Sequence, residues 1–132
     1  MLAATTLVLV VVGTLVSGAG PHSGDSRDVP RIGIPWTSVV WMHAALAVLA
    51  IVLAVVLLIV VWRDPNGLQA RRRTLVFLVV LLAQGAIGGV QALNGLPELL
   101  VALHVLGAAL VWIGALRVLL DTDTRLFRSR NL

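Results

Sequence analysis

The sequence contains no cysteine, no lysine and no tyrosine, and it has few charged residues of either sign. Without cysteine, the chain has neither a disulfide framework nor a thiolate metal site. Charged residues make up 12% of the chain and hydrophobic residues 59%, with a mean hydropathy of +1.02. Such a composition leaves too little polar surface for a water-soluble domain. We therefore expect an integral membrane protein.

Several kinds of motif are also missing. The six acidic residues all lie outside the apolar segments, and no paired carboxylates, phosphate-binding loop or nucleophile–base pair is present. The ten basic residues are all arginine, and they stand between apolar runs rather than on one basic face. The net charge of +4 is therefore better explained by membrane topology than by a nucleic-acid partner.

Four apolar segments are present, at residues 2–18, 36–62, 74–93 and 99–120. A helix needs about 20 residues to cross the hydrocarbon core, and backbone groups in lipid must be hydrogen-bonded within the chain. The alternation of polar and apolar residues that marks membrane β-strands is absent. The first segment lacks the basic start of a signal peptide, which favours a genuine helix. We predict an all-α, integral membrane four-helix bundle over residues 1–120 and a cytoplasmic tail over 121–132.

The arginines predict the orientation. Four of them lie between residues 63 and 73 and three in the tail, whereas the segment 94–98 has none and the segment 21–35 has two balanced by two aspartates. Because cytoplasmic loops are rich in arginine, both termini and the 63–73 loop should face the cytoplasm of a cell (plasma) membrane.

The four segments form two similar pairs. Gly13, Ser17 and Gly20 in the first segment are repeated 72 positions later, by Gly85, Gly89 and Ala92 in the third. The second and fourth segments each carry one histidine, and these are 61 positions apart. We predict two repeated helix pairs, with the small residues at helix–helix contacts.

His43 and His104 are the only histidines inside the apolar segments. Both lie roughly 8–10 Å below the outer boundary, on segments that run in the same direction. Two imidazoles at matching depth can approach one plane from opposite sides, as bis-histidine haem ligation requires. Gly107, Ala108 and Ala47, three or four positions after the histidines, are expected to leave space for a flat macrocycle.

Other interpretations of the histidines remain open at this point. Each could hydrogen-bond a neighbouring helix, carry protons or bind another metal, although no third ligand for zinc lies near that depth. Gln84 and Gln91 share a face of the third segment, where they would either contact a cofactor and orient an imidazole or join helices. Arg27 and Arg31, with His22, could meet the haem propionates at the outer surface.

Four motifs together resemble the haem A synthase family. They are GTLVSGAGPHSGD at 13–25, WMHA at 41–44, QGAIGGVQ at 84–91 and GLPELLVALH at 95–104, and the likeness extends over nearly the whole chain. Family members have eight helices in two similar halves, each with a histidine pair, and they oxidise haem O to haem A for terminal oxidases. This chain resembles the C-terminal half, which holds a haem b, and the resemblance implies that His43 and His104 are its axial ligands.

The resemblance leaves part of the family pattern out. Three features of the family are not in this sequence. They are the N-terminal half, in which family members are expected to oxidise haem O, the glutamate associated with that site, and the outer-loop cysteine pair. The chain is then expected to be a fragment or a half-length protein that needs the other half or a second copy, and not to be an active oxidoreductase alone. Its redox donor or acceptor is not identified by the sequence. The alternatives are a stand-alone b-type electron-transfer cytochrome and a haem-free membrane scaffold or transporter.

Overall fold

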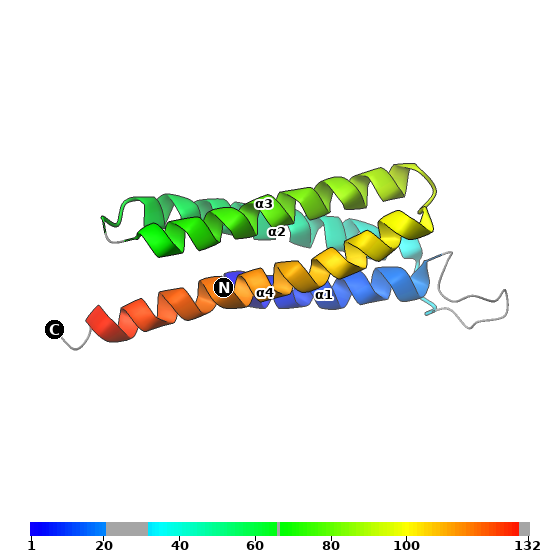
Figure 1. Ribbon diagram of the computed structural model, residues 1–132. Helices are drawn as coiled ribbons and strands as arrows, with labels where there is room; N and C mark the ends of the chain where they lie inside the picture. The colour runs from blue at the N-terminus through cyan, green and yellow to red at the C-terminus, as the bar shows by residue number, and fades with distance from the viewer. Residues whose placement is uncertain (21–31, 66, 130–132) are drawn as a thin grey trace.

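The computed structural model describes residues 1–20, 32–65 and 67–129, the last eight of these by backbone alone. Within them the chain forms four helices, α1 (Leu2–Ala19), α2 (Trp36–Trp62), α3 (Leu68–Leu93) and α4 (Glu98–Ser129). Each helix packs against its neighbours in the chain, and α1 also packs against α4, which closes a ring (Figure 1). The helices α2 and α4 therefore stand diagonally across the bundle. The predicted all-α four-helix bundle is confirmed.

The helix bounds agree with the prediction for α1 and α2 but not for the other two. The third helix begins six residues earlier than predicted, at Leu68 after Gly67, and α4 continues through the predicted tail as far as Ser129. Hydropathy marks the part of a helix that lies in lipid, whereas the helix itself continues wherever good helix formers follow. Arginine and glutamine are such residues, so Gln69 and the three arginines after Ala70 belong to α3.

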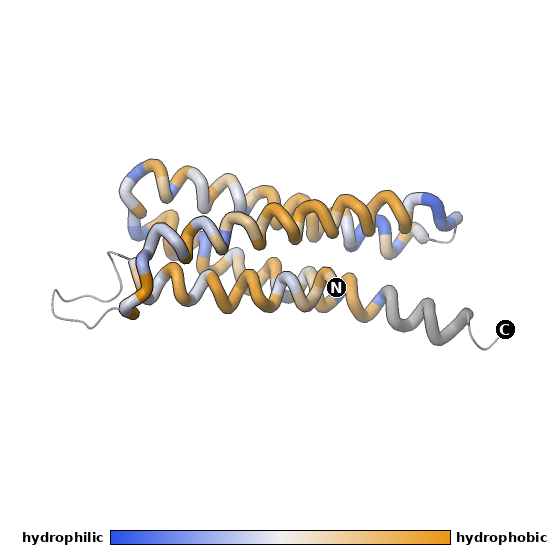
Figure 2. The backbone as a smooth tube through the Cα atoms, turned by 180° about the vertical axis from the view of Figure 1, so that it is seen from behind, coloured by the Kyte–Doolittle hydropathy of each residue, from blue (hydrophilic) through white to orange (hydrophobic). Residues whose placement is uncertain are grey.

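All four helices are long and apolar enough to span a membrane, the last of them over Glu98–Asp121. Hydrophobic residues cover their length, and the α2–α3 connection is hydrophilic (Figure 2). Large apolar side chains such as Val52, Val79 and Leu110 are exposed around the bundle. Because water would not tolerate so much exposed apolar surface, the chain is a multi-pass membrane protein.

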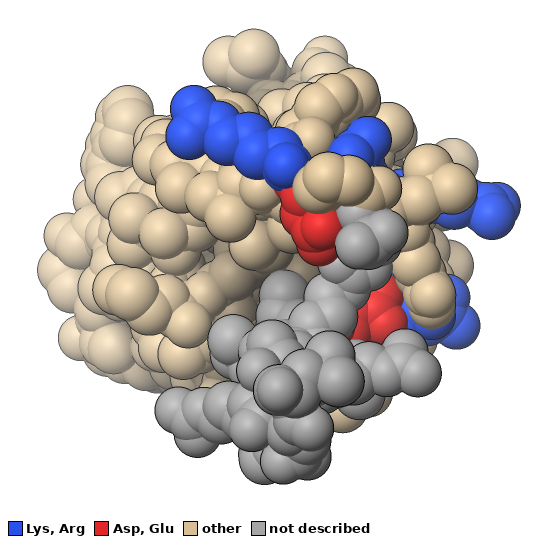
Figure 3. All heavy atoms as spheres, turned by 90° about the vertical axis from the view of Figure 1, so that its left-hand side faces the viewer, with Lys and Arg blue, Asp and Glu red and all other residues tan. Residues whose placement is uncertain are grey.

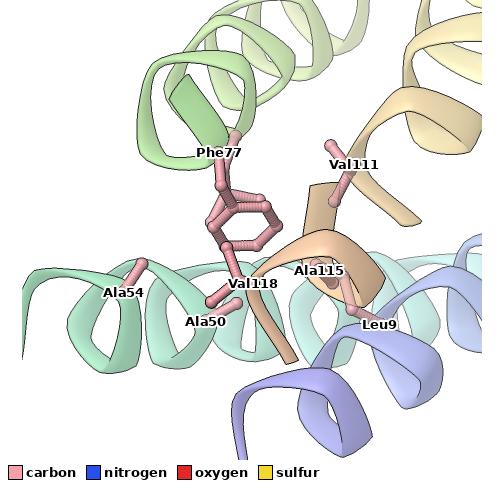
Figure 4. Close-up of a cluster of buried hydrophobic side chains, with 8 residues drawn as sticks. Leu9, Ala50, Ala54, Phe77, Val111, Ala115 and Val118 are labelled. Atoms are coloured by element: carbon pink, nitrogen blue, oxygen red, sulfur yellow. The ribbon is translucent and has the colours of Figure 1, made fainter. Parts of the chain in front are cut away.

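A compact apolar core joins all four helices. Phe77 of α3 is 1% exposed and points toward Ala50 and Ala54 of α2 and Val118 of α4 (Figure 4). Small residues face this ring: a methyl group on Gly114 would lie 2.9 Å from its Cδ2 atom. With no hydrophobic force between helices in lipid, such close contact is what stabilises the bundle.

The core also shows the repeat of the helix pairs. Ala50 and Ala54 of α2 are buried, and so are Val111 and Ala115, the residues 61 positions later in α4. These are the seventh and eleventh residues after His43 and His104, respectively. The offset of 61 residues, predicted from the two histidines, therefore also relates the buried core positions of α2 to those of α4.

The register predicted for α1 and α3 is wrong by three residues. Gly13 packs against the histidine of α2, and its counterpart against the histidine of α4 is Gly88, 75 positions later. Gly85 and Gly89, predicted to lie at a helix contact, are exposed, and a methyl group on either would meet nothing within 4 Å. Small residues of α1 recur in α3 at an offset of 72 residues and also at an offset of 75. Three positions turn a helix by about 300°, so the two offsets correspond to different faces of α3. Only the offset of 75 matches the contacts with the histidines.

Arginines gather at the end of the bundle that carries the α2–α3 connection, here named the arginine end (Figure 3). Arg71 donates hydrogen bonds from Nε to the Val61 carbonyl at 3.2 Å and from Nη2 to the Asp64 carbonyl at 2.6 Å, and it lies over the Trp62 ring. These contacts satisfy carbonyls at the C-terminus of α2. Arg73 Nη1 donates to Asp121 Oδ1 at 2.7 Å, which joins α3 to α4 at the same end.

Candidate functional site

His43 and His104 meet inside the bundle. Their ring centroids are 6.3 Å apart, and the ring planes are inclined at 74°. The two side chains come from the diagonal helices α2 and α4, which do not pack against each other directly, so the rings meet in the middle of the bundle. They lie in the half that is remote from the arginine end, and we name this the histidine half: residues 9–20, 36–47, 84–93 and 98–107.

Each imidazole packs against a glycine of the preceding helix. A methyl group on Gly13 would lie 3.1 Å from Cε1 of His43, and one on Gly88 would lie 3.1 Å from Cε1 of His104. Both rings are also within hydrogen-bonding reach of the backbone four residues before that glycine, at Leu9 and at Gln84. The absence of a Cβ is thus what lets each ring approach the helix backbone. The two histidines have equivalent surroundings because the helix pairs are repeated.

Both histidines retain a buried nitrogen without a partner. The Nδ1 atoms of His43 and His104 are inaccessible to solvent and accept or donate no hydrogen bond. Each imidazole therefore keeps a nitrogen that is not committed to a hydrogen bond, and a ring with a free nitrogen can serve as a metal ligand. In the described part of the chain, no group of three or more His, Cys, Asp or Glu side chains could hold a metal ion. A four-coordinate zinc site therefore lacks protein ligands here.

The glutamines of α3 lie on either side of the histidine level. Gln84 is packed directly on Gly107 of α4, with its Oε1 2.7 Å from where a methyl group on that glycine would stand. Gln91 lies one turn beyond Gly88, toward the α3–α4 connection. The Oε1 atoms of both glutamines are buried without a hydrogen-bond partner.

The space predicted beside Gly107 is thus filled by the Gln84 side chain and is not available to a macrocycle. The glycine pattern gave no sign of this, because a glycine makes room equally for a cofactor or for a neighbouring side chain. Ala47 lies against the apolar core instead of in open space. The residues that closely contact the rings, Gly13 and Gly88, were missed because sequence spacing alone did not give the register of α1 and α3.

Arg27 and Arg31, predicted to meet propionates, lie outside the described residues, as does His22. The described part of the same end has one further polar group that the sequence did not single out as a site. It belongs to Trp36, whose indole Nε1 is buried without a partner.

A hollow of about 330 Å³ lies away from the histidines, and its lining includes Leu2, Leu57 and Leu119. Its lining side chains are hydrocarbon apart from the Met1 thioether, so it has little with which to bind a metal or a polar ligand. The chemistry that the described residues allow is therefore concentrated at the two imidazoles, which can hold one metal centre between them. No family model, no curated protein and no solved structure matches this chain.

Proposed function

We propose that the chain binds one haem b through His43 and His104 and serves as an electron-transferring half of a haem A synthase-like protein. The observation that carries the proposal is the placement of the two imidazoles, which meet between the diagonal helices with centroids 6.3 Å apart and planes inclined at 74°. A metal bound between two imidazoles needs about 2 Å to each nitrogen and about 1 Å more to each ring centre, a total of about 6 Å. The spacing in the structure is therefore close to that of a ligated pair.

The surroundings support haem rather than a bare ion. Two protein ligands leave a metal ion incompletely coordinated, whereas a porphyrin supplies four nitrogens in a plane and needs only two axial ligands. Gly13 and Gly88 allow the rings to approach the backbone, which orients them for this purpose. The apolar core inward of the histidines, formed around Phe77, excludes water from that side.

The assignment to haem A synthase rests on the four motifs quoted above, two of which contain His43 and His104. When bound, haem b exchanges single electrons, and the chain's part is to hold and orient it within the membrane. The arginines at the opposite end support a cytoplasmic location for both termini in a cell membrane, and the haem would then lie nearer the outer surface. Electrons would then pass between this haem and a site at the outer side.

The function is tested by deleting the gene in its own host and measuring haem A, with the wild-type gene or the His104→Ala gene restored. We expect haem A to fall on deletion and to return with the wild type only. Normal haem A levels in the deletion, together with a haem-loaded purified protein, would favour a stand-alone b-type cytochrome, because the ligand pair is complete within one bundle. A protein that takes up no haem in any condition would be a haem-free scaffold or transporter.

A further inference from the structure

Buried polar atoms without partners gather in the histidine half. Five such nitrogen and oxygen atoms occur there among the described residues: Trp36 Nε1, His43 Nδ1, Gln84 Oε1, Gln91 Oε1 and His104 Nδ1. An unpaired polar group in a membrane interior is costly, and proteins retain one mainly where a ligand, ion or water completes it. The two imidazoles belong to the proposed haem site, whose iron would be bound through Nε2 of each ring. The tryptophan and the glutamines remain to be explained.

Trp36 is placed to act from the same side of α2 as His43. It is the first residue of α2, seven positions before the histidine, which is nearly two full turns and about 10 Å along the axis. Its Nε1 would be 3.4 Å from a methyl group on Gly20, the residue that ends α1. An indole N–H can only donate, so the missing partner of Trp36 is an acceptor.

Gln91 lies on the other side of the site. It is three residues beyond Gly88, about 5 Å farther toward the α3–α4 connection than the glycine that touches His104. The Gln91 carbonyl accepts a hydrogen bond from the Leu96 amide at 2.8 Å, which fixes the end of α3 at this point. The unpaired atom of Gln91 is the acceptor Oε1, and turning the amide by 180° brings its NH2 group, which can donate two hydrogen bonds, to the same buried position.

We infer, on the basis of the proposed haem binding, that Trp36 and Gln91 form a carboxylate-recognising end of the haem site and donate hydrogen bonds to the propionates. A haem carries both carboxylates on one edge, at a reach from the iron comparable with the distance from His43 to Trp36. Hydrogen bonds to a carboxylate are stronger than those between neutral groups, and they matter most away from water. Donors at this end would also favour the orientation in which the propionate edge of the macrocycle faces it.

The test compares haem b with its dimethyl ester, in which both carboxylates are masked and the porphyrin and iron are unchanged. The detergent-purified full chain is titrated with each pigment, as wild type and as Trp36→Phe. We expect Trp36→Phe to lower the affinity for haem b by about tenfold to a hundredfold and to change the affinity for the ester little. Trp41→Phe is the matched control: Trp41 is on the same helix but is 75% exposed, so it should change neither affinity.

The comparison within each variant separates recognition from folding. A variant that folds poorly loses affinity for both pigments, and in that case Gln91→Met is titrated in the same way and decides the matter. Equal losses for haem b and ester in both variants, or no loss in either, would overturn the inference while leaving bis-histidine binding intact. A wild type that binds neither pigment would overturn the proposed function as well.

Discussion

Replacing Gly88 by alanine should disturb the histidine pair through a single methyl group. The added Cβ would lie 3.1 Å from Cε1 of His104. Carbon atoms pack best at about 3.5–4.0 Å, so the ring must withdraw from α3 by about 0.4–0.9 Å. Metal–ligand distances tolerate only about 0.2 Å of error. The displacement is therefore larger than an axial ligand can absorb.

The assay is a haem titration followed by absorption and electron paramagnetic resonance spectra of the oxidised protein. Substitutions that disturb the residues orienting a metal ligand typically lower metal affinity by about 10–100-fold, and we expect Gly88→Ala to fall in this range with part of the haem becoming high-spin. Gly89→Ala is the control, because a methyl group there would meet nothing within 4 Å.

The two variants share the same gain in helix propensity, about 0.5–1 kcal/mol, so any difference between them comes from the contact with His104. Haem affinity and a low-spin spectrum in Gly88→Ala equal to those of Gly89→Ala would refute the reasoning. It would mean either that the ring moves without cost or that it does not bind the iron.

Two further predictions concern packing. Arg71→Ala should lower the free energy of unfolding in detergent by about 1–3 kcal/mol, because it removes two hydrogen bonds to carbonyls and a contact with an aromatic ring. The control is Arg72→Ala, at an exposed position, which should lower it by less than about 0.5 kcal/mol. Gly107→Ala should lower the free energy of unfolding by about 1–3 kcal/mol, because its methyl group collides with the Gln84 amide. In a protein that already carries Gln84→Ala, the same substitution should lower it by less. Additive losses in the double variant would contradict this contact.

Much of the fold could be predicted because the membrane imposes it. Apolar length alone located four helices, and the bounds of α1 and α2 were nearly correct, since turns rich in Gly and Pro end these segments where the lipid ends. The extension of α3 and α4 into the polar region could not be predicted from hydropathy. Arg71 illustrates why: it is helical, but its guanidinium is used to satisfy one carbonyl of α2 and one just beyond that helix.

The two histidines of the candidate site could be picked out from the sequence, whereas the residues that pack against them could not. His43 and His104 stood out as the only histidines in apolar segments, and their matching depth followed from counting residues. The glycines that contact them depend on the rotation of α1 and α3, which no property of Gly85, Gly88 or Gly89 in the sequence determines. The burial of the Trp36 N–H was likewise invisible, because it depends on how α1 ends beside α2.

The most direct measurement is the absorption spectrum of the detergent-purified protein supplied with haem, first oxidised and then reduced with dithionite. Wild type is compared with His43→Ala and His104→Ala. The account predicts a low-spin b-type spectrum in the wild type that disappears in both variants, because the two rings, with centroids 6.3 Å apart, would each supply one of the two axial ligands. A wild type without a Soret band despite added haem, or an unchanged spectrum in either variant, would contradict it.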